Sequence, residues 1–160
     1  MPQLATIGVY GFTAESFLAA LDRAGIRLLI DVRQRRGVRG SEYAWANSKR
    51  LQAALHAAGI DYEHRLELAP TTALRHLQYA EDDRLGVGKR SRSELAPDYR
   101  RRYTEEILDE ADLEAVSVSI ERSGPAALLC VERDPEACHR SLVAERLRER
   151  HGLAVEHLVP

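Results

Sequence analysis

The chain has 160 residues, of which 44% are hydrophobic and 30% charged, and its formal net charge is −2. These values are typical of one globular domain with its own core, and the charge argues against a protein that coats nucleic acid indiscriminately. No apolar stretch reaches the length of a membrane span, and the N-terminal sequence has no basic and apolar leader. We therefore expect a single cytoplasmic domain over residues 1–160, without membrane contact or an obligate protein partner.

Strands and helices are predicted to alternate along the first part of the chain. Thr13 can cap a helix that Gly25 ends, and the nearly continuous apolar run of residues 26–32 is typical of a strand covered on both faces. The pattern predicts, in order, a strand, a helix, a strand, a helix and a strand over residues 4–10, 13–25, 26–32, 48–59 and 60–64.

Residues 65–97 are the least regular segment of the chain. They contain Gly86, Gly88 and a basic run, with a short helix expected around Leu74 to Tyr79. A loop of this length within a compact domain is usually functional or mobile. Beyond it, the pattern predicts a long helix, a strand, a helix and a strand over residues 97–122, 126–132, 134–151 and 154–159.

This alternation predicts an α/β fold of three layers, with a mainly parallel five-stranded sheet and helices on both faces. Ligands of such sheets bind beyond the carboxyl ends of the strands. The side chains that follow the predicted strands at that edge are Tyr10, Asp31, Arg33, His64, Arg65, Glu132 and Arg133. The sequence contains no glycine-rich phosphate loop, so a nucleotide cofactor has no signature here.

The segment from Cys130 to Arg140 carries the densest set of reactive groups. Asp134 is a good N-cap for the helix that follows, and Pro135 suits its first turn. The first amides and the dipole of such a helix favour an anion such as phosphate. The side chains gathered at this junction are Glu132, Cys138, His139, Arg140 and Ser141. The alternative interpretation is a buried cysteine beside a capped helix with surface charges.

Cys130 and Cys138 are the two cysteines of the chain, and they flank a predicted tight turn. They do not form a disulfide framework, and thiols are the expected state in a cytoplasmic protein. Metal binding by these cysteines with His139 and His157 is chemically reasonable, but the spacing matches no zinc pattern. We therefore predict neither a metal nor a cofactor.

Basic residues are concentrated in two short segments, which the near-neutral total charge conceals. The first contains Arg33, Arg35, Arg36 and Arg39, and the second contains Lys89, Arg90 and Arg92. Both segments are expected at the same edge of the sheet, where they would form a basic face opposite an acidic one. The alternative is that these are separate solvated loops, so their function depends on whether the fold brings them together.

Several short stretches resemble the family catalogued as domain of unknown function 488. The matching pieces are Thr6-Ile7-Gly8 with Gly11 and Phe17, Ile30-Asp31-Val32-Arg33, Leu128 to Glu132 with Asp134-Pro135, Cys138-His139-Arg140-Ser141, and Val155 to Leu158. They occur in order over nearly the whole chain. The chain departs from the family pattern at Val9, where many members carry a histidine, and at Leu68-Ala69-Pro70, where Leu-Gly-Gly is common.

The resemblance implies a compact α/β protein and an association with DNA. Some relatives are linked to base excision of 5-hydroxymethyluracil and related oxidised pyrimidines. For this chain it therefore implies a DNA glycosylase that flips a modified base out of the stack and hydrolyses its N-glycosidic bond, with DNA as the partner. Such chemistry needs phosphate clamps, an aromatic wedge, a carboxylate near the sugar and donors for the departing base.

Candidate residues can be assigned to each of these roles. The expected catalytic residues are Asp31, Glu132 and His139, and the expected substrate- or phosphate-binding residues are Tyr10, Arg33, Cys138, Arg140 and Ser141. The expected DNA-binding residues are Arg35, Arg36, Arg39, Tyr43, Trp45, Lys89, Arg90 and Arg92. Asp31 and Arg33 could instead only orient each other, and Trp45 could instead belong to the core. Because Lys49 and Lys89 are the only lysines and neither ends a strand, we predict a monofunctional glycosylase without Schiff-base lyase chemistry.

The sequence is also compatible with two other classes of function. Cys138 could act as a nucleophile activated by its neighbours, in sulfur or phosphoryl transfer to a small substrate. The phosphatase spacing Cys-x5-Arg does not occur, however. The arginine-rich loops could also belong to a nucleic-acid-binding protein without catalytic activity. The glycosylase hypothesis requires that the basic segments and the Cys-His-Arg segment converge on one pocket.

Overall fold

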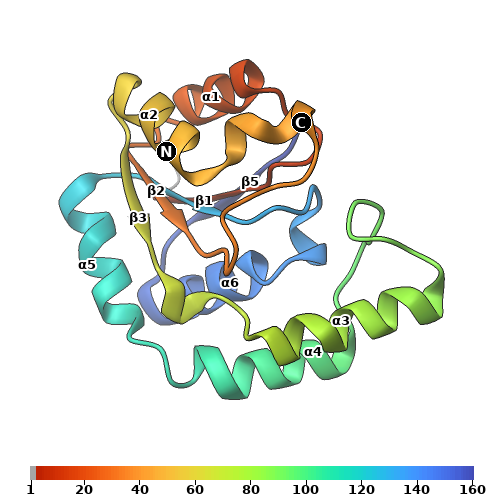
Figure 1. Ribbon diagram of the computed structural model, residues 1–160. Helices are drawn as coiled ribbons and strands as arrows, with labels where there is room; N and C mark the ends of the chain where they lie inside the picture. The colour runs from red at the N-terminus through yellow and green to blue at the C-terminus, as the bar shows by residue number, and fades with distance from the viewer. Residues whose placement is uncertain (1–2) are drawn as a thin grey trace.

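The structure, a computed structural model, describes residues 3–160 and is organised around one parallel five-stranded sheet (Figure 1). The strands are β1 (Leu4–Ile7), β2 (Leu28–Asp31), β3 (Asp61–His64), β4 (Ala126–Leu129) and β5 (Val155–Leu158). Their order across the sheet is β3-β2-β4-β1-β5, and every neighbouring pair is parallel. β1, β2 and β4 are buried throughout their length, as the apolar runs predict for strands covered on both faces.

Six α-helices cover the two faces of the sheet, which confirms the predicted three-layer α/β fold (Figure 1). They are α1 (Ala14–Arg23), α2 (Ser48–Ala57), α3 (Thr72–Leu85), α4 (Pro97–Tyr103), α5 (Leu113–Ser123) and α6 (Arg140–His151). α1 and α2 pack on one face, where Phe17 and Leu51 join the core around Leu29. α3 to α6 contribute to the core of the other face, around Leu128. None of the helices within residues 3–160 has the length and apolarity needed to cross a membrane.

Local sequence signals place the ends of α1 as expected. The Thr13 side chain accepts a hydrogen bond from the Ser16 amide, and the Ser16 hydroxyl accepts one from the Thr13 amide, so both form a capping box. Gly25, just after the helix, has a φ of 69°, which a residue with a side chain rarely adopts. These interactions join residues close in sequence, and so the pattern alone predicts them.

The helices on the other face differ from the expectation in three places. The predicted short helix near Leu74 is α3, which extends over 14 residues. The predicted helix over 97–122 is instead α4, one π-helical turn and α5, because the Asp112 carboxylate accepts the Ala115 amide and starts a new helix. The predicted helix from Asp134 begins only at Arg140, after a 3₁₀ turn over Pro135–Ala137 and an extended Cys138.

The topology marks the edge at which a ligand can bind. From β2 the chain proceeds to β3 at one border of the sheet, whereas from β4 it proceeds to β5 at the other border. β2 and β4 are neighbours, so their following segments diverge and leave a crevice beyond their carboxyl ends. Parallel α/β sheets bind ligands at such a switch point.

Candidate functional site

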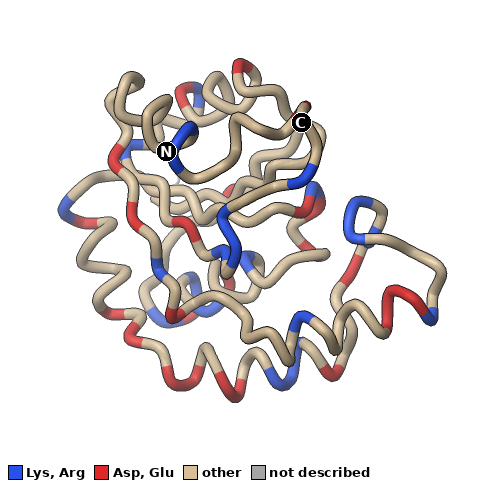
Figure 2. The backbone as a smooth tube through the Cα atoms, in the orientation of Figure 1, with Lys and Arg blue, Asp and Glu red and all other residues tan. Residues whose placement is uncertain are grey.

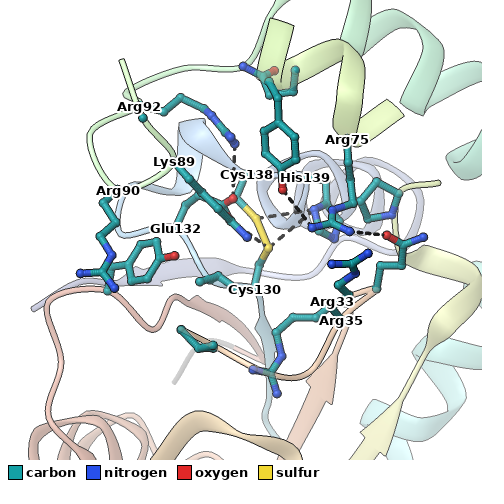
Figure 3. A pocket seen from close by; sticks show the side chains of 18 of the residues that line it. Arg33, Arg35, Arg75, Lys89, Arg90, Arg92, Cys130, Glu132, Cys138 and His139 are labelled. Atoms are coloured by element: carbon teal, nitrogen blue, oxygen red, sulfur yellow. Dashed lines mark hydrogen bonds and ion pairs between the residues drawn. A yellow bond between two sulfur atoms is a disulfide. The ribbon is translucent and has the colours of Figure 1, made fainter. Parts of the chain in front are cut away.

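A cavity of about 690 Å³ opens at this edge of the sheet (Figure 3). Its volume lies within the range of sites that bind small molecules or single nucleotides. Its walls come from the segments after β2 and β4, from α3, and from the loop between α3 and α4. The sequence-predicted residues that line it are Tyr10, Arg33, Arg35, Arg39, Lys89, Arg90, Arg92, Glu132, Cys138 and His139. The two basic segments and the Cys-His-Arg segment therefore converge on one cavity, as the glycosylase hypothesis requires.

Asp31 is fully buried at the end of β2 and does not line the cavity. Its two carboxylate oxygens accept Arg33 Nε at 2.9 Å and Nη2 at 2.8 Å, and the Tyr62 hydroxyl donates to Oδ2 at 2.6 Å. Arg33 also donates Nη1 to the Ala46 carbonyl at 2.9 Å. The Asp31 carboxylate and the Arg33 guanidinium therefore use their hydrogen-bonding atoms within the protein. This arrangement agrees with the alternative interpretation of the sequence, in which Asp31 orients Arg33 and the segment after β2.

Glu132 is the carboxylate that lines the cavity. Its side chain is buried, and its Oε1 accepts Arg92 Nη1 at 3.3 Å. Arg92 is held in turn by Asp82, with Nη2 donating to Oδ2 at 2.8 Å. Glu132 therefore presents a negative charge to the cavity from a fixed position beside one guanidinium group.

Cys130 and Cys138 form a disulfide at the cavity wall, so the prediction of free thiols is wrong (Figure 3). The extended backbone of Cys138 brings its sulfur to that of Cys130, at the end of β4. Within the oxidised chain, neither sulfur is available as the thiolate nucleophile that a sulfur- or phosphoryl-transfer enzyme would need.

His139 is buried between the disulfide and the end of β2. Its Nε2 lies 2.8 Å from the Val32 carbonyl, which can only accept, so Nε2 carries the proton. Its Nδ1 is then unprotonated and lies 3.6 Å from both sulfurs. Burial lowers the pKa of His139 to about 4, so the ring is neutral at physiological pH.

Arg140 and Ser141 do not line the cavity. The buried Arg140 guanidinium donates Nη1 to the Glu132 carbonyl at 2.7 Å and Nη2 to the Arg133 carbonyl at 3.1 Å. The Ser141 hydroxyl donates to the Cys138 carbonyl at 2.9 Å. The first amides of α6 donate to the carbonyls of Cys138 and His139. The amides of Ser141, Leu142 and Val143 are therefore occupied within the chain, and Arg140 supports the Glu132 backbone.

Tyr10, Tyr43 and Arg90 form a cluster beside the cavity, with the two ring planes tilted by 55°. Tyr10 and Arg90 line the cavity, whereas Tyr43 does not. The two rings lie 5.2 Å apart, and the Arg90 guanidinium carbon lies 5.2 Å from each ring centroid. Arg90 also pairs with Glu42 at 3.1 Å. Burial raises the pKa of Tyr10, which keeps its hydroxyl protonated. This cluster of a guanidinium group and two tilted rings offers a cationic and aromatic surface to a planar ligand.

Trp45, the other expected aromatic contact, lies elsewhere. Its ring packs 4.9 Å from that of Phe17 and lines a smaller hollow beside α1 and α2. It belongs to the apolar cluster of that face, so its role as a wedge at this cavity is not supported. Arg36 also lies outside the cavity lining and donates to the Tyr62 hydroxyl at 3.4 Å.

Three basic residues of the cavity lining, Arg35, Arg39 and Lys89, form no ion pair within residues 3–160. Arg35 and Arg39 are exposed, and Lys89 is partly exposed. Figure 2 shows the basic positions after β2 and those of the loop between α3 and α4 on the same side of the molecule. These three cations are therefore available for anionic ligands, whereas Arg33 and Arg92 are neutralised by buried carboxylates.

The cavity wall that α3 contributes was not predicted from the sequence. Arg75 donates Nη1 to the Gln34 side-chain oxygen at 2.8 Å and Nη2 to the Tyr79 hydroxyl at 2.9 Å. All three residues line the cavity, with Gln78 beside them. The spacing of Arg75, Gln78 and Tyr79 places them on one face of a helix, which is the signal that could have identified this wall.

Comparison with known proteins adds one finding to this geometry. No curated protein matches the chain, and no solved structure matches it. The model of one family matches residues 13–147, a segment that includes α1, the basic segments, the disulfide and most of α6. The chain belongs to the family described as domain of unknown function DUF488.

Proposed function

We propose that this protein is a DNA glycosylase that excises 5-hydroxymethyluracil or a related oxidised pyrimidine. The activity is the one that the sequence resemblance implies. The observation that carries the proposal for this chain is the cavity, in which unpaired cations and an aromatic rim surround one buried carboxylate, Glu132. No single element of the fold supplies this combination.

The unpaired cations are suited to phosphate binding. Arg35 and Arg39 follow β2, and Lys89 approaches from the opposite loop, so a sugar–phosphate backbone could be held from two sides. Such contacts position DNA without reading its sequence. The near-neutral charge of the whole chain is compatible with this arrangement, because the cations are concentrated at one edge.

The cavity and its rim are suited to a flipped nucleotide. An extruded base needs a pocket to enter and a group that replaces it in the stack. Tyr10 and Arg90, which line the cavity beside Tyr43, provide an aromatic and cationic surface against which a base can pack. The polar wall formed by Gln34, Arg75 and Tyr79 provides hydrogen-bonding groups for the edge of a pyrimidine.

Glu132 is the proposed catalytic residue. As the N-glycosidic bond breaks, positive charge develops on the sugar, and a fixed carboxylate in a buried site stabilises that charge. Water then adds to the sugar carbon, and the base leaves with the bonding electrons and takes up a proton. Arg75, at the polar wall, is placed to stabilise the negative charge on the departing base.

We still predict hydrolysis without a covalent intermediate. The reason taken from the sequence, that neither lysine ends a strand, does not by itself exclude Lys89 as a nucleophile. Lys89 does not follow a strand, but it lines the cavity and carries the only amine there. Borohydride trapping on a lesion-bearing oligonucleotide distinguishes the two mechanisms. We expect no covalent adduct, and we expect Lys89→Arg, which keeps the charge, to retain excision. A trapped adduct that disappears in Lys89→Arg would instead establish lyase chemistry.

The proposal is tested with a panel of oligonucleotides, each with one modified base at a defined position. We expect alkali-labile abasic sites at 5-hydroxymethyluracil or a related oxidised pyrimidine and none at unmodified bases. Glu132→Gln should lower the single-turnover rate by about 10²-fold or more, because a charge-stabilising group is lost. Glu136→Gln, an exposed change in the neighbouring turn, is the matched control and should leave the rate unchanged.

Two outcomes would contradict the proposal. Salt-sensitive oligonucleotide binding without abasic sites on any substrate would indicate a nucleic-acid-binding protein without this catalytic activity. Equal rates for Glu132→Gln and Glu136→Gln would remove Glu132 from the mechanism.

A further inference from the structure

Cys130, Cys138 and His139 form a buried cluster that the glycosylase mechanism does not use. The two sulfurs and one ring nitrogen of His139 are potential ligand atoms that lie within 4.8 Å of one another. The cysteines are 5% and 1% exposed, respectively, and the cluster borders the cavity. Thiolates and imidazole nitrogens are the ligands that thiophilic divalent cations such as Zn²⁺ prefer.

The orientation of His139 is that of a metal ligand. Its Nε2 is held by the Val32 carbonyl at 2.8 Å, which leaves the lone pair of Nδ1 directed at the sulfurs. In metalloproteins a ligating histidine almost always donates its other ring N–H to such an acceptor, which fixes the tautomer and the ring.

The distances agree with tetrahedral coordination. With metal–sulfur and metal–nitrogen bonds of about 2.3 and 2.05 Å, tetrahedral angles place a sulfur and a nitrogen about 3.6 Å apart. His139 Nδ1 lies 3.6 Å from the sulfur of Cys130 and 3.6 Å from that of Cys138. Only the sulfurs must separate, to about 3.8 Å by the same geometry, and reduction of the bond between them permits this.

The surroundings favour the charge of such a site. Two thiolates carry two negative charges, and Glu132 Oε2 lies 3.1 Å from Cys130 Sγ, where it can complete the coordination. Arg92 donates to Glu132 and to the Ala137 carbonyl, so a guanidinium group lies beside the cluster. A divalent cation neutralises the two thiolates, and Arg92, which also pairs with Asp82, lies beside Glu132.

We propose that the reduced chain binds one thiophilic divalent cation of the Zn²⁺ class through Cys130 Sγ, Cys138 Sγ and His139 Nδ1, and that disulfide formation prevents this binding. A dithiol reductant transfers two electrons and two protons to the disulfide, which gives two thiols, and is itself oxidised to a disulfide. The cation then displaces the two thiol protons and forms two metal–sulfur bonds and one metal–nitrogen bond. The site is a redox-controlled metal centre in the wall of the cavity.

The test uses untagged full-length protein, either oxidised or reduced anaerobically with a phosphine, and titrated with Co²⁺ as a spectroscopic substitute for Zn²⁺. We expect the reduced protein to bind one Co²⁺ per chain, with thiolate-to-cobalt charge-transfer absorption in the near ultraviolet and the visible bands of tetrahedral cobalt. The oxidised protein should show neither. Zn²⁺ should displace Co²⁺ and slow the alkylation of both cysteines by iodoacetamide.

Variants locate the site. Cys138→Ser should reduce the charge-transfer absorption by about half, and His139→Gln should retain it with weaker binding. Each should weaken Co²⁺ binding by more than the 10–100-fold that loss of an outer-shell partner costs. His64→Gln is the matched control, because His64 Nε2 also lies 2.8 Å from a backbone carbonyl, that of Arg33, and no described cysteine lies beside it.

The result that overturns the proposal needs no variant. Reduced wild-type protein that binds no Co²⁺, or binds it without the charge-transfer absorption, excludes the site. Equal binding by oxidised and reduced protein, or by wild type and Cys138→Ser, would place the metal elsewhere. These readouts involve no DNA, so they are independent of whether the proposed glycosylase activity is found.

Discussion

Arg33 and Asp31 form a buried, doubly hydrogen-bonded ion pair directly beneath the cavity, and the Asp31 carboxylate also accepts the Arg33 backbone amide at 3.1 Å. Residues two apart in an extended segment have their side chains on the same side, so Asp31 and Arg33 can form these hydrogen bonds directly. The pair fixes the direction in which the chain leaves β2, and therefore the position of Gln34 and Arg35 in the cavity wall. The Asp-Val-Arg sequence is thus a structural support for the site.

Asp31→Asn should destabilise the protein by about 3 kcal/mol, because it leaves the Arg33 charge buried without its partner. Urea unfolding followed by circular dichroism measures this change. Asp22→Asn, at an exposed position in α1, should change the free energy of unfolding by less than about 0.5 kcal/mol. Equal stability of the two variants would contradict the supporting role of Asp31.

Lys89→Gln and Arg35→Gln should each weaken oligonucleotide binding and make it less dependent on salt. Each removes one cation that can neutralise a phosphate, so the slope of log affinity against log salt concentration should fall in magnitude by about 1. Fluorescence anisotropy over a range of salt concentrations measures the slope. Lys49→Gln, at an exposed position of α2 outside the cavity, should leave the slope unchanged. A similar decrease of the slope in Lys49→Gln would indicate nonspecific binding.

Gly8→Ala should destabilise the protein and disturb the Glu132 segment. A Cβ at this position would overlap the Glu132 carbonyl oxygen. It would also approach the Arg140 guanidinium, which donates a hydrogen bond to that carbonyl. The neighbouring atoms are backbone, so relief requires a shift of the segment after β4, at a cost of about 1–3 kcal/mol. Gly37→Ala, whose Cβ would meet only Asn47 Oδ1 at 3.8 Å, is the control for thermal unfolding. A tolerated Gly8→Ala would show that this close approach is not required.

Tyr103→Phe should lower stability near pH 7 by about 1–3 kcal/mol, because the Tyr103 hydroxyl donates to the buried Leu68 carbonyl at 2.5 Å. Burial also raises the pKa of Tyr103 well above its usual value. The folded chain therefore keeps this phenol protonated, while the unfolded chain ionises it near pH 10. The contribution of this pKa difference to the free energy of unfolding is fully present below about pH 10 and is lost as the pH rises further.

Urea unfolding at neutral and alkaline pH, with tyrosinate absorbance as a second signal, tests this dependence. Wild-type stability should fall more steeply above about pH 10 than that of Tyr103→Phe. Parallel curves for the two proteins would mean that Tyr103 ionises normally in the folded state.

The sequence alone determined the alternation of strands and helices, and with it the three-layer α/β fold. The Thr13 cap, the turn at Gly25 and the apolar runs of β2 and β4 depend on residues close together in the chain. The position of the first basic segment at the ligand-binding edge also follows from the sequence, because this segment follows the carboxyl end of a parallel strand, β2.

The tertiary structure alone decided how the side chains at that edge are used. Asp31 and Glu132 both follow apolar strands, and only their partners distinguish a buried support from a carboxylate in the cavity. The wall formed by α3 likewise depends on the packing of whole elements, and the disulfide depends on the distance between two sulfurs that only the folded turn brings together. Local patterns describe each segment's own backbone preferences, whereas the pairing of charges and sulfurs depends on distances that only the folded chain sets.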